Sequence, residues 1–337
     1  MIKRVTIKDV AQDAGVSISV VSYVLNGAEK PVISEATRSR VLESVKRLGY
    51  VPNRTAAALR RGKSNTIGVI SYWTHSYVYG SFIDGITSAA KELGYNTLIY
   101  QAPLGNTEPD FIRYYADRMF DGVLLILPYE REKYNFPRHL AELERLNVPY
   151  AAIGDPVEGF KPHSIHIDYA NTVYTACQYF IKKGYSRVTY VTPHSETYGA
   201  LDRFRGYTEV MRDYGLVPDV CWVEDIERRL PDFDAVVTFK SEEAQMVLRA
   251  ATAQGKKVPQ DFEMIAANTE SFAEYMIPPL STVRLPDVDM GAAAAKLLID
   301  LIDGEPPYYA PDIPSCTLAL RGTTHERNVP DVAYDPH

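Results

Sequence analysis

The stretch that decides the N-terminal fold is TIKDVAQDAGVSISVVSYVLNG, which runs from Thr6 to Gly27. It contains two short segments with helical apolar periodicity, each preceded by a hydroxyl residue that can cap a helix. Gly15 ends the first segment, Ser17 opens the second, and a third segment of the same kind spans residues 34–49. Two short helices joined by a tight turn and braced by a third predict a helix-turn-helix unit.

The second predicted helix has two different faces. At about 100° per residue, short polar groups with an isoleucine and a tyrosine fall on one side: Ile18, Ser19, Ser22, Tyr23 and Asn26. The opposite side carries Val20, Val21, Val24 and Leu25. The valine and leucine side predicts a core, and the polar side suits the major groove of DNA. An amphipathic helix in a small bundle without a ligand is the weaker alternative.

Charge is distributed unevenly along the 337 residues. The formal net charge is −7, yet residues 1–63 hold 12 Lys and Arg against 5 acids and carry +7, whereas the remainder carries −14. A basic module attached to an acidic body is what a phosphate-binding head would show. A basic solvated face without a partner explains the charge equally well, so charge alone does not decide.

The motifs of this region, taken together, resemble the LacI/GalR (lac repressor) family of bacterial transcription regulators. The resemblance rests on the order and spacing of residues 6–17, Val21-Ser22-x-Val24-Leu25-Asn26-Gly27, Thr37-Arg38-x-Arg40-Val41-Leu42, Leu48-Gly49-Tyr50-x-Pro52-Asn53 and Ala56-x-x-Leu59. It then continues from Thr66 to about Thr324, which is nearly the whole chain.

The resemblance implies specific contacts to double-stranded operator DNA. Base contacts are implied for Ile18, Ser19 and Tyr23. Phosphate contacts, which position the protein without reading sequence, are implied for Thr6, Ser17, Ser22, Asn26, Thr37, Tyr50, Asn53 and Arg54. The family usually has arginine where Tyr23 stands, and arginine is the best bidentate reader of guanine. We therefore expect an altered operator half-site.

Residues 53–63 predict a short helix between the head and the body. Asn53 can cap it, and Thr55-Ala56-Ala57-Ala58-Leu59 favours helix. The resemblance makes this the hinge helix, in which Leu59 wedges into a central minor-groove step and Ala56 permits close approach. Without the resemblance, an ordinary linker helix with Leu59 on a core would be the preferred interpretation.

From residue 67 onward, apolar strands alternate with helices. The strands are predicted at 67–71, 97–100, 122–127, 150–153, 187–191, 235–238 and 263–267, and helices at 81–93, 171–183 and 242–254. This alternation over roughly 250 residues predicts an α/β body of two doubly wound parallel-sheet subdomains. The resemblance implies a periplasmic-binding-protein-like fold with three crossovers, placed near Asp168, Leu285 and Cys316.

The predicted organisation has four parts. Residues 1–52 form the helix-turn-helix head and 53–63 the hinge helix or linker, while 64–324 form the effector-binding and dimerisation body and 325–337 a C-terminal tail. Ligands of parallel sheets bind beyond the strand C-termini, so we expect the effector in the cleft between the subdomains.

Candidate effector-binding residues follow the strand ends. Flat rings beside polar groups hold sugars through their apolar faces and hydroxyls, which suggests Tyr72, Trp73, Ser76, Tyr79 and Phe82. An aromatic loop that packs against a neighbour is the alternative. Arg203 stands three residues before Gly206, as does the family's effector-binding arginine, and its planar fork can hold two vicinal hydroxyls or a carboxylate.

Three positions depart from the family pattern. Lys240 stands where most members have an amide, Asn268 where most have aspartate, and Gly154-Asp155 where members often have Asp-Arg or a similar pair. Lys240 and Asn268 make the predicted cleft more positive, which slightly favours an acidic or phosphorylated sugar. The segment between Cys221 and Asp234 is short, so a helix that most members carry there is predicted to be missing or trimmed.

The sequence offers no recognisable motif for catalysis, a cofactor or a metal. Gly62-Lys63-Ser64 lacks the first glycine of a phosphate-binding loop because position 57 is alanine. His166 and Asp168 fall on one face at a strand end, but the resemblance makes this segment scaffold. Cys177, Cys221 and Cys316 suggest neither a disulfide framework nor a metal site. No apolar run approaches the ~18–20 residues of a membrane span, and the polar N-terminus argues against a signal peptide, so we expect a cytoplasmic protein without a cofactor.

The sequence thus predicts a transcription regulator, by preference a repressor, that binds a near-palindromic operator as a homodimer and holds a sugar-like effector. Two alternatives stay open at this stage. In one, a protein coeffector controls the body; in the other, the body is a sugar-binding or enzymatic domain whose head is incidental.

Overall fold

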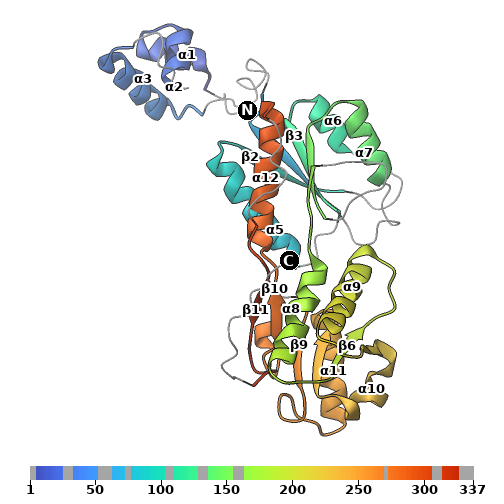
Figure 1. The fold of residues 1–337 in the computed structure, drawn as a ribbon. Coiled ribbons are helices and arrows are strands. Elements are labelled where there is room, and N and C mark those ends of the chain that lie inside the picture. The colour runs from blue at the N-terminus through green and yellow to red at the C-terminus, as the bar shows by residue number, and fades with distance from the viewer. Residues whose placement is uncertain are drawn as a thin grey trace. The chain divides into compact units, whose positions relative to one another are not determined.

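The computed structural model describes residues 5–25, 33–51, 63–72, 77–102, 110–127, 136–154, 163–268, 272–305 and 313–325. Contacts between residues divide the chain into two units, Met1–Ser64 and Asn65–His337. We call the first unit the head and the second the body, and each is described by itself (Figure 1).

The described part of the head contains three helices, which are α1 (Ile7–Ala14), α2 (Ile18–Leu25) and α3 (Glu35–Leu48). Their ends are set by local chemistry. The Asp9 carboxylate accepts hydrogen bonds from the backbone N–H and hydroxyl of Thr6, Ser17 Oγ accepts one from the Val20 N–H, and Ser34 Oγ accepts one from the Thr37 N–H. Gly15 and Gly49 close α1 and α3 in the left-handed conformation. The predicted helix-turn-helix is therefore confirmed.

Small apolar residues form the core of the head. The fully buried members are Val10, Ala11, Ala14, Val21, Val24 and Val41. Val20 and Leu25, which share the apolar side of α2, pack partly buried against the same cluster. The two predicted faces of α2 are thus the two faces that the structure has.

The body contains two sheets. The first has the order β2-β1-β3-β4-β5 and is entirely parallel. Its strands are β1 (Thr66–Ser71), β2 (Asn96–Gln101), β3 (Gly122–Ile126), β4 (Tyr150–Ile153) and β5 (His163–Ile165). The second has the order β11-β10-β9-β8-β6-β7, in which only the edge strand β11 runs antiparallel. Its strands are β6 (Val188–Thr192), β7 (Asp219–Trp222), β8 (Ala235–Thr238), β9 (Glu263–Ala266), β10 (Ser281–Arg284) and β11 (Thr317–Ala319).

Helices cover both faces of each sheet. The first sheet is covered by α5 (Tyr77–Glu92) and α12 (Asp287–Asp303) on one face and by α6 (Asp110–Ala116) and α7 (Phe136–Arg145) on the other. The second is covered by α8 (Tyr169–Lys182) and α9 (Tyr198–Asp213) on one face and by α10 (Ile226–Arg229) and α11 (Ser241–Ala253) on the other. We call these two layered assemblies the N-subdomain and the C-subdomain (Figure 1).

Glycines permit the closest helix contacts in the body. A Cβ on Gly85 of α5 would overlap the Val288 carbonyl of α12, and one on Gly291 of α12 would overlap the Phe82 carbonyl of α5. In the C-subdomain, a Cβ on Gly206 of α9 would overlap the Ala170 carbonyl of α8. Each pair of helices therefore packs backbone against backbone at these points.

The chain passes between the subdomains three times. It leaves β5 of the first sheet for α8, which packs on the second, and it leaves β10 of the second sheet for α12, which packs on α5. After α12 it returns to β11 of the second sheet. These passages lie where crossovers were predicted, near Asp168, Leu285 and Cys316.

All seven predicted strands are present, with ends within one residue of those expected. Four further strands of three or four residues each, β5, β7, β10 and β11, were not predicted. The predicted shortening between Cys221 and Asp234 corresponds to α10, a single turn flanked by two 3₁₀ turns, Val223–Asp225 and Leu230–Asp232. A further 3₁₀ segment, Ala273–Tyr275, precedes β10.

Candidate DNA-reading surface and ligand pocket

Helix α2 presents a set of side chains that are free of the head core. Ile18 is 40% exposed and Tyr23 39% exposed, Ser19 is exposed, and Ser22 is half-buried. These are the residues predicted for base reading, with the neighbouring Ser22. Because the core side of the same helix is buried, they form one continuous solvent-facing strip that can enter a groove.

Predicted phosphate contacts gather at helix N-termini. Thr6 precedes α1, Ser17 precedes α2, and Thr37 lies in the first turn of α3. N-terminal turns carry unsatisfied backbone N–H groups and a partial positive charge, which suits a phosphate oxygen. Tyr50 is half-buried at the end of α3, where it packs against the head core.

An ion pair joins the first and third helices of the head. The Asp13 carboxylate accepts hydrogen bonds of 2.5 Å from Ser44 Oγ and from an Arg47 guanidinium nitrogen. The Ser44 hydrogen bond, followed by that of Arg47, holds the pKa of Asp13 below its ordinary value. The carboxylate is therefore favoured in its ionised form, and it joins α3 to α1.

The remaining predicted DNA contacts, Asn26, Asn53, Arg54, Ala56 and Leu59, lie outside the described residues, as do the effector candidates Trp73, Ser76 and Asp155. Their assigned roles stay predictions.

Arg203 of α9 is fully buried in the C-subdomain. Its guanidinium carbon lies 4.1 Å from the ring centroid of Tyr169 and 4.7 Å from that of Phe239. One guanidinium nitrogen also donates a 3.2 Å hydrogen bond to the Gly199 carbonyl one turn earlier. The predicted effector arginine is thus held between two aromatic rings, one of which begins α8 directly after the first crossover.

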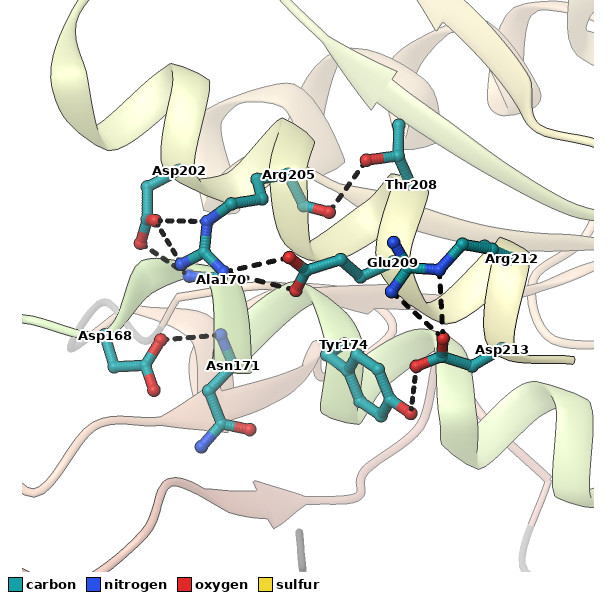
Figure 2. A network of polar contacts seen from close by, with 10 residues as sticks. All are labelled: Asp168, Ala170, Asn171, Tyr174, Asp202, Arg205, Thr208, Glu209, Arg212 and Asp213. Carbon is teal, nitrogen blue, oxygen red and sulfur yellow. Dashed lines mark hydrogen bonds and ion pairs between the residues drawn. The ribbon is translucent and has the colours of Figure 1, made fainter. Parts of the chain in front are cut away.

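A polar seam ties α9 to the start of α8 (Figure 2). The Asp202 carboxylate accepts a 2.9 Å hydrogen bond from the Ala170 N–H and pairs with Arg205 at 2.6 Å. Asp168 caps α8 by accepting a hydrogen bond from the Asn171 N–H. Burial, the largest influence, raises the pKa of Asp168. Asp168 therefore serves as the N-cap of α8.

The aromatic cluster expected after the first strand is not formed among the described residues. Tyr72 is buried in the core under α6 and α7, where its hydroxyl lies 2.8 Å from Nδ1 of His139. Tyr79 and Phe82 are buried on the opposite face of the sheet. Strand geometry thus separates these rings, and each packs in a core cluster. Their role as effector contacts stays a prediction.

Lys240 and Asn268 lie near strand ends, as predicted. Lys240 follows β8 and places its ammonium 5.2 Å from the Phe239 ring centroid, beside the ring that covers Arg203. Asn268 follows β9 and is buried. Phe239 therefore connects Lys240 with Arg203, whereas neither lysine nor arginine lines the pocket described next.

A pocket of about 480 Å³ opens beyond the C-terminal ends of β6 and β7. Its lining comes from three segments: Thr192, Pro193, His194, Ser195 and Glu196 after β6; Ala200, Leu201 and Phe204 on α9; and Trp222 at the end of β7. Trp222 and His194 were not predicted as ligand contacts: Trp222 ends β7, a strand that was not predicted, and His194 follows β6 without a motif that marks it. The position of a pocket beyond parallel strand ends is the one expected for a ligand site.

Within the described residues, no group of three or more His, Cys, Asp or Glu side chains is placed to hold a metal ion. None of the helices in the described ranges combines the length and apolar character needed to cross a bilayer.

Comparisons with known proteins place the two parts of the chain. Residues 6–53 match the profile of the bacterial regulatory proteins of the lacI family, and residues 177–324 match the periplasmic binding protein-like domain. The regulator CelR of Thermobifida fusca is 28% identical over 324 aligned positions, covering 90% of this chain and 93% of CelR. Catabolite control protein A of Priestia megaterium is 28% identical, with 90% and 94% covered.

Solved structures agree with these matches. A CelR–cellobiose complex shares 26% identity and a TM-score of 0.63, covering 95% of this chain and all of that one. The lac repressor dimer bound to operator and the anti-inducer ONPF has a TM-score of 0.76 at 21% identity, with 95% and 99% covered, and supports the fold.

Together, these features define two-part transcription regulators, in which a helix-turn-helix head precedes a body of the periplasmic-binding-protein type. The chain carries the DNA-binding domain of the LacI family of bacterial regulatory proteins, followed by a periplasmic-binding-protein-like domain. Its relatives are DNA-binding transcription regulators rather than enzymes.

Proposed function

We propose that this chain is a repressor that binds a near-palindromic operator as a homodimer and releases or tightens on that operator when a sugar-like ligand enters the body. The observation that carries the proposal is the exposed strip of Ile18, Ser19 and Tyr23 on α2, in a head of charge +7. Positive charge supplies general affinity for DNA, and the strip supplies sequence preference.

Exposed apolar side chains support the homodimer. Ile277 is 94% exposed and Tyr275 77% exposed, both on the segment that leads into β10. Large apolar groups at such exposure often mark protein contacts. We expect Ile277→Asp to weaken dimerisation at least tenfold in analytical ultracentrifugation. Val217→Asp, at a valine that is 84% exposed, is the matched control and should leave the dimer intact; equal effects would remove the support from this segment.

The pocket beyond β6 and β7 supports a small-molecule effector. It offers an indole ring, a phenyl ring and hydroxyl groups, the combination that binds sugar rings. The related CelR has been solved with cellobiose. The comparisons give no support to a protein coeffector, so that alternative is not carried further.

The polar contacts between α8 and α9 support a structural connection between the pocket and the first crossover between the subdomains. Leu201 and Phe204 line the pocket, and their neighbours Asp202 and Arg203 contact Ala170 and Tyr169 at the start of α8. A ligand that shifts α9 therefore acts on the first crossover. Because such coupling is reciprocal, DNA and effector must alter each other's affinity by the same factor.

Selection of bound DNA tests the proposal directly. Genomic fragments retained by the full-length protein are sequenced, and we expect a near-palindromic motif. Tyr23→Ala should weaken binding to the selected site about tenfold and relax one position in each half-site, as the loss of one base contact does. Tyr214→Ala, at a body tyrosine that is 38% exposed, is the control. Absence of any enriched motif would contradict the proposal.

A further inference from the structure

His194 lies flat against Trp222 in the pocket. The two ring centroids are 3.9 Å apart and the ring planes differ by 21°, which is stacking. His194 Nε2 also lies 2.8 Å from Oε1 of Glu224. An imidazole thus covers one face of the indole and places a nitrogen at its edge against a carboxylate. Both rings line the pocket.

The charged groups around this stack are acidic. Glu196 lines the pocket, and Glu224 pairs with His194. The α9 side of the pocket contributes Ala200, Leu201 and Phe204, which carry no charge. Neither lysine nor arginine lines it. A phosphate or carboxylate group entering this pocket would meet carboxylates without a lining cation to offset them.

We propose that His194 is a specificity-determining residue that occupies the place on Trp222 that the effector's ring takes. This inference rests on the proposed effector site. The chemistry of the stack then defines the ligand class: an uncharged ring with an apolar face for the indole and a hydrogen-bond donor at its edge for Glu224. The acidic or phosphorylated sugar that Lys240 and Asn268 favoured is replaced by a neutral one.

Competition follows from this geometry. A ring that stacks on the covered face of Trp222 must displace the imidazole and take over its contact with Glu224. A ligand with only an apolar face loses that contact, and a ligand with only hydroxyl groups gains no stacking. Displacing His194 therefore costs binding free energy, and only a ring with both an apolar face and a hydrogen-bond donor offsets that cost.

Fluorescence of Trp222 provides a test that needs no effector. The chain has two tryptophans, Trp73 and Trp222, so full-length protein carrying Trp73→Phe reports on Trp222 alone. In that background we expect His194→Ala to raise the acrylamide quenching constant about twofold, because the indole face becomes open. His166→Ala, at an exposed histidine outside the pocket, should leave it unchanged. An unchanged quenching constant in His194→Ala would overturn the proposal.

Calorimetric ligand titration in full-length protein that keeps Trp73 tests specificity. The probes are cellobiose and the matched pair D-glucose and D-glucose 6-phosphate. We expect His194→Ala to bind at least one neutral probe about threefold to tenfold more tightly than protein with His194 intact, the range expected for one stacking contact. Glu224→Gln keeps the shape but loses the charge, and should weaken that binding.

Other outcomes count against the inference. Tighter binding of D-glucose 6-phosphate than of D-glucose, or failure of every neutral probe to bind His194→Ala, would contradict it. The DNA selection described above, made with the same variants, separates the two proposals. A retained operator motif with a negative titration removes the role of His194 alone, whereas loss of the motif in the parent protein removes the proposed function.

Discussion

Helix α2 of the head and helix α9 of the body hold their assigned contact residues in opposite ways. On α2, Tyr23 is exposed while Val21 on the other face is fully buried, so reading DNA and holding the head together use different side chains. On α9, Arg203 is fully buried between Tyr169 and Phe239. The same side chain therefore contributes to the fold and to the proposed ligand response.

This difference shows in which part of the molecule a substitution can change function without changing stability. In the head, a substitution on the reading face is expected to change DNA preference without unfolding the protein. In the C-subdomain, buried charged groups couple the two properties, because burial makes each charge depend on its surroundings. The predictions below test this contrast, from the largest expected change in unfolding free energy to the smallest.

The buried ion pair of the C-subdomain should give the largest effect. Lys183 Nζ lies 2.6 Å from a Glu263 carboxylate oxygen, and both side chains are nearly fully buried, at 3% and 2% exposed. Lys183→Met leaves Glu263 buried without its partner, which should cost about 4 kcal/mol of unfolding free energy. Urea unfolding followed by tryptophan fluorescence measures it. Lys256→Met, at a 4.0 Å surface pair with Asp261, should cost less than about 1 kcal/mol.

The pH dependence of that difference has a definite sign. Burial pushes the pKa of Glu263 upward, but hydrogen bonds from Lys183, Tyr185 and the His325 backbone outweigh it and leave the pKa below the ordinary 4.5. A carboxyl with a lowered pKa stabilises the fold above 4.5 and loses that contribution as pH falls through its folded value. The gap between the parent protein and Lys183→Met should therefore be largest near neutral pH and narrow below about pH 4.5. A gap that widens on acidification would contradict this account.

Arg203 and Arg205 form a matched pair on one helix. Arg203→Ala removes a buried side chain from between two rings and should cost about 3 kcal/mol. The Arg205 side chain is 54% exposed and pairs with Asp202 and Glu209. Arg205→Ala should therefore lower the unfolding free energy by less than about 1 kcal/mol. Thermal or urea unfolding of the two variants decides. Similar losses of unfolding free energy in the two variants would mean that the buried side of α9 contributes no more to stability than its exposed side.

These contrasts also explain how far the sequence alone could predict the molecule. The head was predictable because its signals are local: caps at Thr6, Ser17 and Ser34 and a 3.6-residue period lie within a few residues of what they control. The strands of the body were predictable where an apolar run was long enough, as in 122–127. The pocket was not, because His194, Phe204 and Trp222 come from three segments that only the sheet order brings together.

The tyrosines after the first strand show the same limit of prediction from sequence, here for side chains that were expected together and lie apart. Tyr72 and Tyr79 are close in sequence and were expected in one cluster, yet they pack on opposite faces of the first sheet. Composition indicates aromatic residues near a strand end, but it does not indicate which of them the core takes. Burial against α7, through the contact of Tyr72 with His139, decided that.

The core face of α2 should show an intermediate effect. Val21→Ala removes buried methyl groups and should destabilise the head by about 2 kcal/mol. Hydrogen exchange of peptides from α1, α2 and α3 in the full-length protein measures this locally. Val51, which is 66% exposed, provides the control, and Val51→Ala should stay within about 0.5 kcal/mol. Unchanged exchange in Val21→Ala would mean that the apolar face does not hold the head together.

Tyr23→Arg should have the smallest effect on stability and the clearest effect on function. The side chain is exposed, so hydrogen exchange of the head should be unchanged within about 0.5 kcal/mol. Tyrosine offers one hydroxyl and an apolar ring edge, whereas arginine can bond both acceptors of guanine in the major groove. Selection of bound DNA should therefore enrich guanine at one position of each half-site in the variant. An identical motif for both proteins would show that this face of α2 does not read that base, and the separation between reading and folding residues would lose its strongest example.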